Sequence, residues 1–335
     1  MKIALTCSIK PDNMTGEEQD RYAEFDSRET IDDLARAIKA NGHSVEIIDV
    51  KDDIKEVLES KRKYINMVFN VAEGLEGENR EALVPRICEE LKIPFTAAGS
   101  ETTTITLNKA RTKDILEKNN IPTPRFQVFE SGEEPLNGMN FPLLVKPLLE
   151  GSSKGLFNEN LVDDEGSLKK IIKKIKMHYN QPTIVEEFLD GREFTVSVIG
   201  YKNPVVLPIV EIKFDHLPSN IHPMDSYEAK WLYDNPEAGI DPLVCPAEID
   251  KEIEGKIKDT ALKTFRVLGC KDWARIDIRL DKDNVPNVLE VNALPGFMKD
   301  PKENSRLPKA AYAAGWSYER LIGEVIRSAV QRWGI

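Results

Sequence analysis

Apolar and polar positions follow two different rhythms along the first hundred residues. Short apolar runs, typical of buried strands, are separated by stretches in which apolar residues recur every three or four positions, as on one face of a helix. The pattern predicts strands over residues 2–7, 44–49 and 64–70 and helices over residues 28–40 and 82–91. Strands that alternate with helices in this way are typical of a small parallel sheet.

The pattern changes at residues 99–106, a Ser/Thr-rich stretch that leads to Asn108, a favourable N-cap for a helix over residues 109–118. Pro122 and Pro124 follow that helix and end it, because the residue before a proline is disfavoured in the α region. The next predicted elements are strands over residues 126–129, 143–146 and 183–185 and a helix over residues 167–178. We place the first domain boundary at the Ser/Thr-rich stretch.

The last part of the chain is rich in β-structure. After Arg192, alternation assigns Glu193, Thr195 and Ser197 to one face of a strand and Phe194, Val196 and Val198 to the other. Residues 213–246 are polar and interrupted by prolines, which is typical of a functional lid or a disordered segment. Amphipathic helices are predicted over residues 250–268 and 318–333. These changes divide the chain into expected domains at residues 1–102, 103–188 and 189–335.

Composition excludes several classes of protein. Of the 335 residues, 41% are hydrophobic and 31% are charged, which suits a folded multidomain chain and excludes a disordered one. The net charge is −11, so a nucleic-acid backbone would be repelled. The longest apolar stretches fall far short of the ~20 residues of a membrane span, and the opening residues lack a signal-peptide core. With four widely spaced cysteines, we expect a reduced, cytoplasmic protein.

Glycine spacing excludes two common nucleotide-binding loops. The 19 glycines contain no G-x-G-x-x-G pattern and no G-x-x-x-x-G-K-[ST] pattern. The sequence therefore does not support a nicotinamide or flavin Rossmann site or a Walker-type phosphate loop.

The strongest local signal is a pair of alternating segments, residues 274–280 and 288–292, joined by turn residues. Alternation assigns the apolar side chains, Leu289 and Val291 among them, to a buried face and the charged side chains to the opposite face. The two segments are predicted to form an antiparallel hairpin.

A turn centred at residues 283–284 would place Asp277 opposite Glu290 and Arg275 opposite Asn292. Opposed carboxylates destabilise a sheet by ~0.2–1 kcal/mol unless a cation neutralises them. Asp277, Glu290 and Asn292 are oxygen ligands of the kind that Mg²⁺ prefers, and Mg²⁺ commonly shares its ligands with nucleotide phosphates, which implies ATP. The alternative is a solvent-facing hairpin whose carboxylates pair with neighbouring arginines.

Two further segments are compatible with nucleotide binding. Lys146 ends a predicted strand, and the loop after it contains Ser152 and Ser153, so backbone N–H groups and an ammonium could hold phosphate oxygens. The alternative is a Gly/Ser turn with surface lysines. The acidic linker at residues 184–193 could line an adenine and ribose pocket between two domains, although in isolation it is simply a turn.

Taken together and in order, the motifs resemble those of the ATP-grasp superfamily, and specifically the D-alanine:D-alanine ligase family. The resemblance runs from about Asn70 to the C-terminus and rests on K-P-x-x-E-G-S-S-x-G, E-F-T-V, Y-E-A-K, C-P-A, L-G-C-K-x-W-x-R-I-D and L-E-x-N-x-x-P-G. It implies an α/β (α+β) protein of ATP-grasp architecture, with an N-terminal parallel α/β domain, a small central lid domain and a C-terminal antiparallel-sheet domain. It also implies ATP with Mg²⁺, or Mn²⁺ in its place, small amino acid or peptide substrates, and a homodimer.

The resemblance also implies roles for individual residues. Lys109, Lys146, Ser152, Ser153 and Lys230 would contact the ATP phosphates; Glu186, Glu187, Phe188, Leu189 and Glu193 would hold adenine and ribose; and Asp277, Glu290 and Asn292 would bind the metal. Arg275 would stabilise the acyl phosphate and the tetrahedral intermediate, and Ser152 and Lys230 would also act in catalysis. Gly296 would form part of the oxyanion site. Ser305 would contact the carboxylate of the second substrate.

The chain departs from the family pattern on the substrate side. The family's glycine-rich loop after the first strand is missing, and Glu24 or Glu29 substitutes only loosely for its glutamate. The family's His-Gly segment reads Asn-Val-Ala-Glu-Gly here, beginning at Asn70, and Trp231 replaces an aromatic residue that usually carries a hydroxyl. Arg80 is a candidate carboxylate clamp that the usual pattern lacks.

These observations predict an ATP-dependent carboxylate–amine ligase that forms an amide through an acyl phosphate and releases ADP and phosphate, with D-alanyl-D-alanine as one product to consider. One alternative is a ligase that joins an amine to a non-amino-acid carboxylate in a specialised pathway. Another is a nucleotide-binding protein without catalysis, against which the intact Lys146, Arg275 and Asp277 argue.

Overall fold

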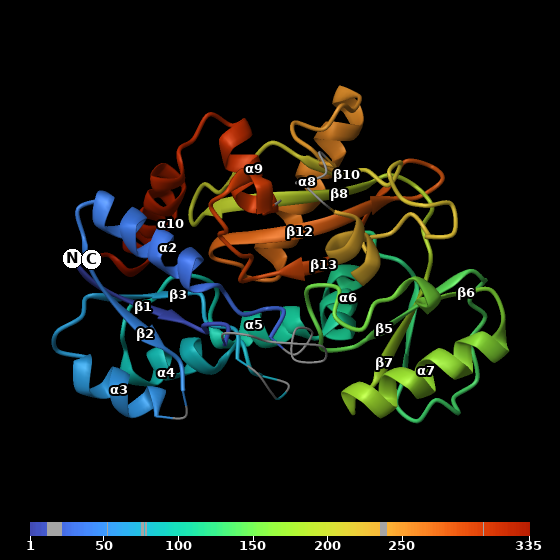
Figure 1. The fold of residues 1–335 in the computed structure, drawn as a ribbon, viewed down its shortest axis with the longest axis horizontal. Coiled ribbons are helices and arrows are strands. Elements are labelled where there is room, and N and C mark those ends of the chain that lie inside the picture. The colour runs from blue at the N-terminus through green and yellow to red at the C-terminus, as the bar shows by residue number, and fades with distance from the viewer. Residues whose placement is uncertain (12–21, 52, 75–76, 78, 235–239, 304) are drawn as a thin grey trace.

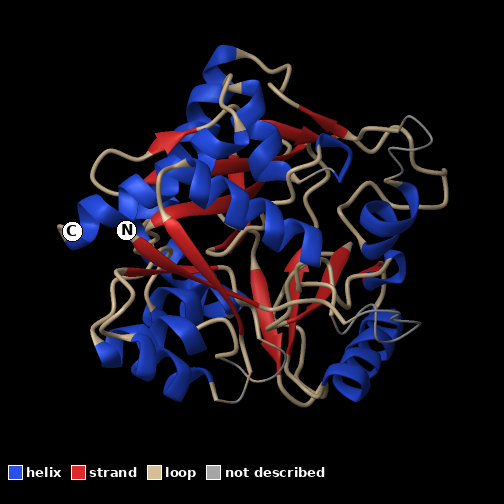
Figure 2. Ribbon diagram, turned by 60° about the vertical axis from the view of Figure 1, so that its left-hand side comes forward, coloured by secondary structure: helices blue, strands red, loops and turns tan. Residues whose placement is uncertain are grey.

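Three β-sheets follow one another along the chain in the computed structural model, which describes residues 1–11, 22–51, 53–74, 77, 79–234, 240–303 and 305–335 and only the backbone of Trp231. Figure 1 shows the first sheet in blue, the second in green and the third in yellow to orange. The two ends of the chain lie side by side in both Figure 1 and Figure 2. Within the described residues, no helix has the length and apolar character that a bilayer span requires.

The N-terminal sheet has three parallel strands in the order β2-β1-β3. Its elements are β1 (Lys2–Cys7), α2 (Arg28–Ala40), β2 (Ser44–Asp49), α3 (Ile54–Lys61), β3 (Met67–Asn70) and α4 (Leu83–Leu91). The predicted helix over residues 28–40 is confirmed, and the Ser27 side chain caps it by accepting a hydrogen bond from Thr30 N. Helix α3 was not predicted, because Ile54 and Leu58 alone bury an apolar stripe too short to show a period.

The central sheet is antiparallel, in the order β4-β7-β5-β6, and α7 packs its apolar residues against it. The elements of this part are α5 (Ser100–Leu107), α6 (Lys109–Lys118), β4 (Phe126–Phe129), β5 (Leu143–Pro147), the 3₁₀ helix η1 (Asn158–Asn160), β6 (Leu161–Val162), α7 (Glu165–Tyr179) and β7 (Thr183–Glu187). The predicted cap is present, since the Asn108 side chain accepts from Arg111 N. The Ser/Thr-rich stretch is helix α5, in which hydroxyls such as that of Thr103 bond back to the preceding turn and hide the helical period.

The C-terminal sheet is antiparallel, in the order β11-β10-β8-β12-β13, with β9 paired to β8. Its parts are β8 (Glu193–Gly200), β9 (Val205–Val206), β10 (Val210–Ile212), the π-helix η2 (Glu228–Tyr233), β11 (Leu243–Val244), α8 (Lys251–Val267), β12 (Asp272–Leu280), β13 (Pro286–Asn292), the 3₁₀ helix η4 (Pro301–Glu303), α9 (Arg306–Ala313) and α10 (Tyr318–Trp333). Helix α8 covers the apolar face of this sheet, and α9 and α10 pack into the core shared with the N-terminal sheet. On the face opposite α8, Ile199 and Trp273 belong to that core, while Arg275, Asp277 and Glu290 form a polar area beside it.

The predicted hairpin is confirmed at the polar positions, where Arg275 pairs with Asn292 and Asp277 pairs with Glu290. Beyond Asp277 the register shifts, so that Ile278 pairs with Val288. The residue passed over by this bulge is Leu289, which is half-buried and lines a pocket, so the prediction that it belongs to the buried face was wrong. The three sheets fall within the three predicted ranges, and the domain boundaries themselves stay a prediction.

Candidate active site

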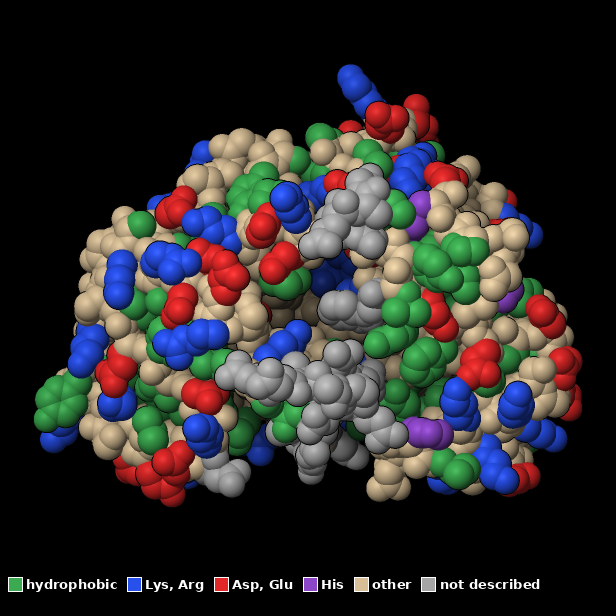
Figure 3. Space-filling model, viewed as in Figure 1, with side chains coloured by type: hydrophobic (Ala, Val, Ile, Leu, Met, Phe, Trp, Pro, Cys, Tyr) green, Lys and Arg blue, Asp and Glu red, His purple; other side chains and the backbone are tan. Residues whose placement is uncertain are grey.

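A pocket of about 740 Å³ lies between the central sheet and the polar face of the C-terminal sheet. Figure 3 shows the molecule hollowed near the centre of the view, with Lys and Arg side chains visible inside the hollow. The predicted residues that line the pocket are Lys109, Lys146, Ser153, Glu186, Glu187, Phe188, Leu189, Glu193, Asp277 and Glu290. Side chains from several separate motifs therefore meet around one space.

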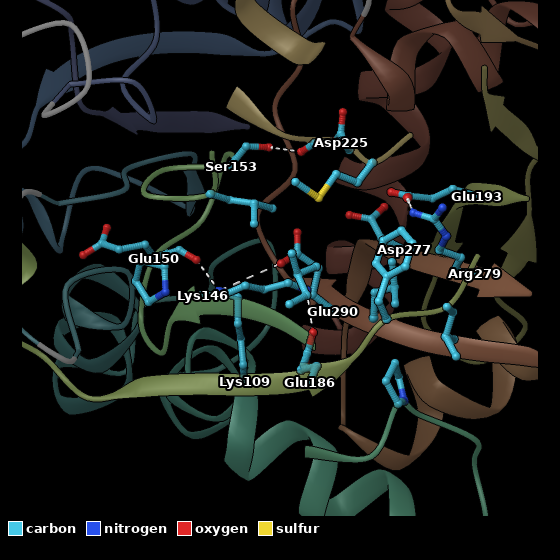
Figure 4. A pocket seen from close by; sticks show the side chains of 18 of the residues that line it. Lys109, Lys146, Glu150, Ser153, Glu186, Glu193, Asp225, Asp277, Arg279 and Glu290 are labelled. Carbon is cyan, nitrogen blue, oxygen red and sulfur yellow. Dashed lines mark hydrogen bonds and ion pairs between the residues drawn. The ribbon is translucent and has the colours of Figure 1, made fainter. Parts of the chain in front are cut away.

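Lys109 and Lys146 reach this pocket from different elements (Figure 4). The Lys109 ammonium at the start of α6 donates to the Glu150 carbonyl and lies 3.9 Å from the Glu290 carboxylate. The Lys146 ammonium on β5 lies 2.6 Å from a Glu186 oxygen. Both lysines are buried, so mobile ions screen their charges weakly. Two such cations suit a polyanion such as a triphosphate.

The other end of the pocket combines apolar side chains with carboxyl groups. Residues 186–189 continue from β7, and Leu144 and Leu289 supply apolar walls beside them. The Glu193 carboxyl accepts a hydrogen bond from Arg279 at 2.9 Å. Burial raises the pKa of Glu193 to about 7, against the opposing effect of the Arg279 charge. An apolar slot next to carboxyl oxygens suits a planar base with a hydroxyl-bearing sugar.

The Asp277 carboxylate stands at the centre of the polar face. It accepts hydrogen bonds from Arg275 Nε at 3.0 and 3.2 Å and from Arg275 Nη2 at 2.8 Å, and a further one from the Thr195 hydroxyl. Burial would raise the pKa of Asp277, but the charge and hydrogen bonds of Arg275 hold it below its usual value. Asp277 is therefore ionised at neutral pH.

The chemistry of Asp277, Glu290 and Asn292 fits a hard divalent cation. Glu290 forms one long ion pair with Lys109, and the Asn292 side-chain oxygen accepts from Leu294 N at 2.9 Å and keeps a second lone pair. Throughout the described residues, no group of three or more His, Cys, Asp or Glu side chains is arranged to hold a metal, so a third protein ligand would be an amide oxygen. Two carboxylates and an amide match the ligand preference of Mg²⁺.

The long polar segment, of which residues 213–234 and 240–246 are described, contacts the serine loop, residues 151–155, at Asp225. Ser153 has a left-handed φ of 60°, and its hydroxyl donates to the Asp225 carbonyl at 2.8 Å. Arg306, which no motif indicated, donates to both Asp225 carboxylate oxygens at 2.7 Å. The described part of the segment is thus held on both sides of Asp225, as a closed lid would be.

A second pocket, about 1300 Å³, is adjacent to the first across the Arg275–Asp277 pair, since Asp277 lines the first pocket and Arg275 lines the second. The predicted residues that line it are Glu24, Ser152, Lys230, Arg275, Asn292, Gly296 and Ser305. Burial, followed by the nearby charge of Arg306, lowers the pKa of Lys230 to about 8. The part of the second pocket next to the Arg275–Asp277 pair is cationic, because Arg275, Lys230 and Arg306 line it. A cationic lining suits anionic reacting groups.

Glu24 and Arg80 meet where the N-terminal part touches the serine loop. Glu24 accepts from Arg80 Nη2 at 3.0 and 3.1 Å and from Gly151 N at 3.1 Å, while Arg80 Nη1 donates to the Leu149 carbonyl at 2.8 Å. A Cβ at Gly151 would lie 2.5 Å from a Glu24 oxygen, so only glycine allows this approach. The predicted carboxylate clamp, Arg80, thus binds a carboxylate of the protein itself.

Sequence reasoning missed Glu73 and Glu81, which line a small acidic pocket together with Glu24. Burial, reinforced by neighbouring glutamates and opposed by Arg80, raises the pKa of Glu73 and raises the pKa of Glu81 to about 7. Glu73 occupies the place of the family's histidine, a departure that could have drawn attention to it. We refer to Glu24, Glu73, Arg80 and Glu81 as the N-terminal junction.

Asn70 and Arg80, two of the predicted substrate residues, line neither of these pockets. Asn70 is fully buried, and its side-chain oxygen accepts from the Thr6 hydroxyl at 2.9 Å and from Ala72 N at 3.2 Å. The side chain of Trp231 lies outside the described part of the structure, although its backbone belongs to η2.

Comparison with known proteins identifies the family. The family model described as the D-ala D-ala ligase C-terminus matches residues 115–327, which is more than half of the chain. The chain belongs to the D-alanine–D-alanine ligase family. A D-alanine–D-alanine ligase of Carboxydothermus hydrogenoformans is 34% identical over 310 residues, which cover 90% of this chain and 92% of that protein. The uncharacterized protein y4sG of Sinorhizobium fredii is 36% identical over 267 residues, 80% of this chain and 75% of its own length.

Solved structures of the D-alanine–D-alanine ligase family share the fold. The D-alanine–D-alanine ligase of Bacillus anthracis complexed with ATP superposes with a TM-score of 0.74 at 24% identity, covering 100% of this chain and 99% of that one. The VanG D-Ala:D-Ser ligase of Enterococcus faecalis gives a TM-score of 0.73 at 20% identity, covering 98% and 99%. The predicted family, the ATP-grasp architecture and the ATP-dependent ligase class are thereby confirmed.

Proposed function

We propose that this ligase joins the carboxylate of one small amino acid or peptide to the amine of a second and releases ADP and phosphate. The observation that carries the proposal is that Lys109 and Lys146 line the first pocket and that the Arg275–Asp277 pair links its lining to that of the second. The first pocket supplies the buried lysines and carboxylates that suit ATP with a divalent cation, and the second, which Arg275 and Lys230 line, would take the substrates.

In the first step, a carboxylate oxygen of the first substrate attacks the γ-phosphorus of ATP, and the bond from that phosphorus to ADP breaks. Lys109 and Lys146 hold the phosphates, and the lid segment around Asp225 excludes water from the transfer. Mg²⁺ held by Asp277, Glu290 and Asn292 would shield phosphate charge when it is bound.

In the second step, the amine of the second substrate attacks the acyl carbon, loses a proton and displaces phosphate. Arg275 is fixed by Asp277 and so presents its remaining donors to the negative charge that develops on the tetrahedral intermediate. Lys230 lines the same pocket, and a pKa of about 8 leaves it largely cationic at pH 7. Ser305 and Gly296 lie at the side of the pocket where the second substrate's carboxylate would bind.

D-alanyl-D-alanine is one candidate product, because relatives that align over most of this chain are named D-alanine–D-alanine ligases. The acidic N-terminal junction, with Glu73 in place of the family's histidine, favours testing a wider range of first substrates, including carboxylic acids that are not amino acids.

The test is incubation with ATP, Mg²⁺ and pools of D- and L-amino acids, dipeptides and simple carboxylic acids. We expect ADP release that depends on both substrates, measured by a coupled assay, with a new amide detected by mass spectrometry. Release of AMP and pyrophosphate, or no nucleotide turnover with any pool, would contradict the proposal.

A further inference from the structure

Lys113 is a buried cation that does not line the nucleotide pocket. It lies on α6, its side chain is 1% exposed, and its ammonium is 2.8 Å from Glu186 Oε1. A lysine is almost never this deeply buried without a partner, because removing its charge from water is costly. The sequence offers no motif for Lys113, and none of the roles described above uses it.

Two further contacts orient Lys113. Its ammonium donates to the Thr123 hydroxyl at 2.8 Å, and that hydroxyl donates in turn to the Val288 carbonyl of β13 at 2.7 Å. The Phe126 ring lies 5.9 Å from the ammonium. Lys113 is therefore held by both the central and the C-terminal sheets, and its position does not depend on Glu186 alone.

Glu186 is shared between two lysines. Oε1 faces Lys113 at 2.8 Å, and Oε2 faces Lys146 at 2.6 Å. Burial would raise the pKa of Glu186, but the two ammonium groups lower it to about 2. Because two ammonium groups contact the buried Glu186 carboxylate, one of them can move away and the carboxylate still keeps a cationic partner.

We propose that Lys113 is a positioning residue for nucleotide binding, which keeps Glu186 paired so that Lys146 can turn from Glu186 to the phosphates. This inference rests on the proposed ATP site. Lys146 faces the pocket and Lys113 does not, so Lys146 is the one that can reach a ligand. When it turns, Oε2 of Glu186 becomes an acceptor for an amine on the edge of the base.

Without Lys113, the departure of Lys146 would leave a buried carboxylate unpaired, and Lys146 would stay on Glu186. We expect Lys113→Met to raise the Kd for ATP at least tenfold, measured by isothermal titration calorimetry with Mg²⁺, while kcat at saturating ATP stays within about threefold of the wild type. Lys118→Met, which changes an exposed lysine of the same helix, is the matched control and should leave both values unchanged.

A double-mutant cycle separates positioning from a general structural role. If Lys113 acts through Glu186, Lys113→Met should cost at least fivefold less ATP affinity in a Glu186→Gln background, where Lys146 has no carboxylate to neutralise. Equal losses in both backgrounds, or an ATP Kd within twofold of the wild type for Lys113→Met alone, would overturn the role of Lys113. A wild-type protein that binds no ATP would instead overturn the proposed function itself and the inference with it.

Discussion

The proposed nucleotide cleft, which is the pocket lined by Lys109, Lys146 and Asp277, and the N-terminal junction are both built from buried charges, but they are built differently. In the cleft, most of the charged side chains project from regular elements: Lys109 begins α6, and Asp277 and Glu290 pair across one face of the hairpin. At the junction, Glu24 and Arg80 lie outside helices and strands and meet only through the fold. Charges on a regular scaffold can be predicted from spacing, whereas charges on irregular segments cannot.

The two regions also differ in the part of the reaction that we assign to them, which is ATP use for the cleft and the choice of the first substrate for the junction. The cleft keeps the motifs of the family, and the junction is where the chain departs from them. We therefore expect substitutions in the cleft to abolish turnover of every substrate, and substitutions at the junction to change stability and the choice of first substrate while ATP binding persists.

The largest effect is expected for Asp277→Ala. The change removes the partner that fixes Arg275 and one of the two carboxylates at the phosphate end, so kcat should fall by about 10³-fold or more. Steady-state ADP release measures the loss, and a melting temperature close to that of the wild type would show that the fold persists. Asp283→Ala, an exposed residue of the hairpin turn, is the matched control. Retained turnover in Asp277→Ala would remove this carboxylate from the mechanism.

A smaller effect, on stability, is expected for Arg80→Met. The substitution leaves Glu24 without its cation partner in a mostly buried site, which should cost about 3 kcal/mol and lower the thermal midpoint by several degrees. Differential scanning calorimetry measures the shift, and Arg86→Met on the exposed side of α4 is the control. The Kd for ATP should change less than threefold, and a loss as large as that in a cleft variant would break the distinction between the two regions.

The smallest effect is a pH dependence of stability that comes from Glu81. Its pKa in the folded protein is raised to about 7, so the folded state binds more protons than the unfolded state above the ordinary pKa of a glutamate. The stability from this group is present below pH ~4.5 and is lost as pH rises through about 7. Between pH 5 and 7.5 the melting temperature of the wild type should therefore fall by a few degrees more than that of Glu81→Gln. Parallel curves for the two proteins would show that Glu81 titrates normally.

Much of the fold follows from local pattern. The helices over residues 28–40 and 318–333 were predicted to within a residue, because each has a polar cap and a continuous apolar stripe. Helix α5 was missed, because threonines mask its period. The register of the hairpin was predicted at Asp277 and Glu290. The bulge that places Leu289 at the pocket was not predicted, because the alternation of apolar and polar residues continues through it.

The amino-acid sequence by itself determined most of the helices and strands, the polar positions of the hairpin at Arg275, Asp277 and Glu290, and the motif residues that line the first pocket. These properties depend on residues that are neighbours along the chain. Only the tertiary structure decided that Lys113 and Lys146 share Glu186, that Arg306 holds Asp225 and that Arg80 holds Glu24. The physical reason is that any buried charge needs a partner, and which of the many available opposite charges becomes that partner is set by how distant segments pack.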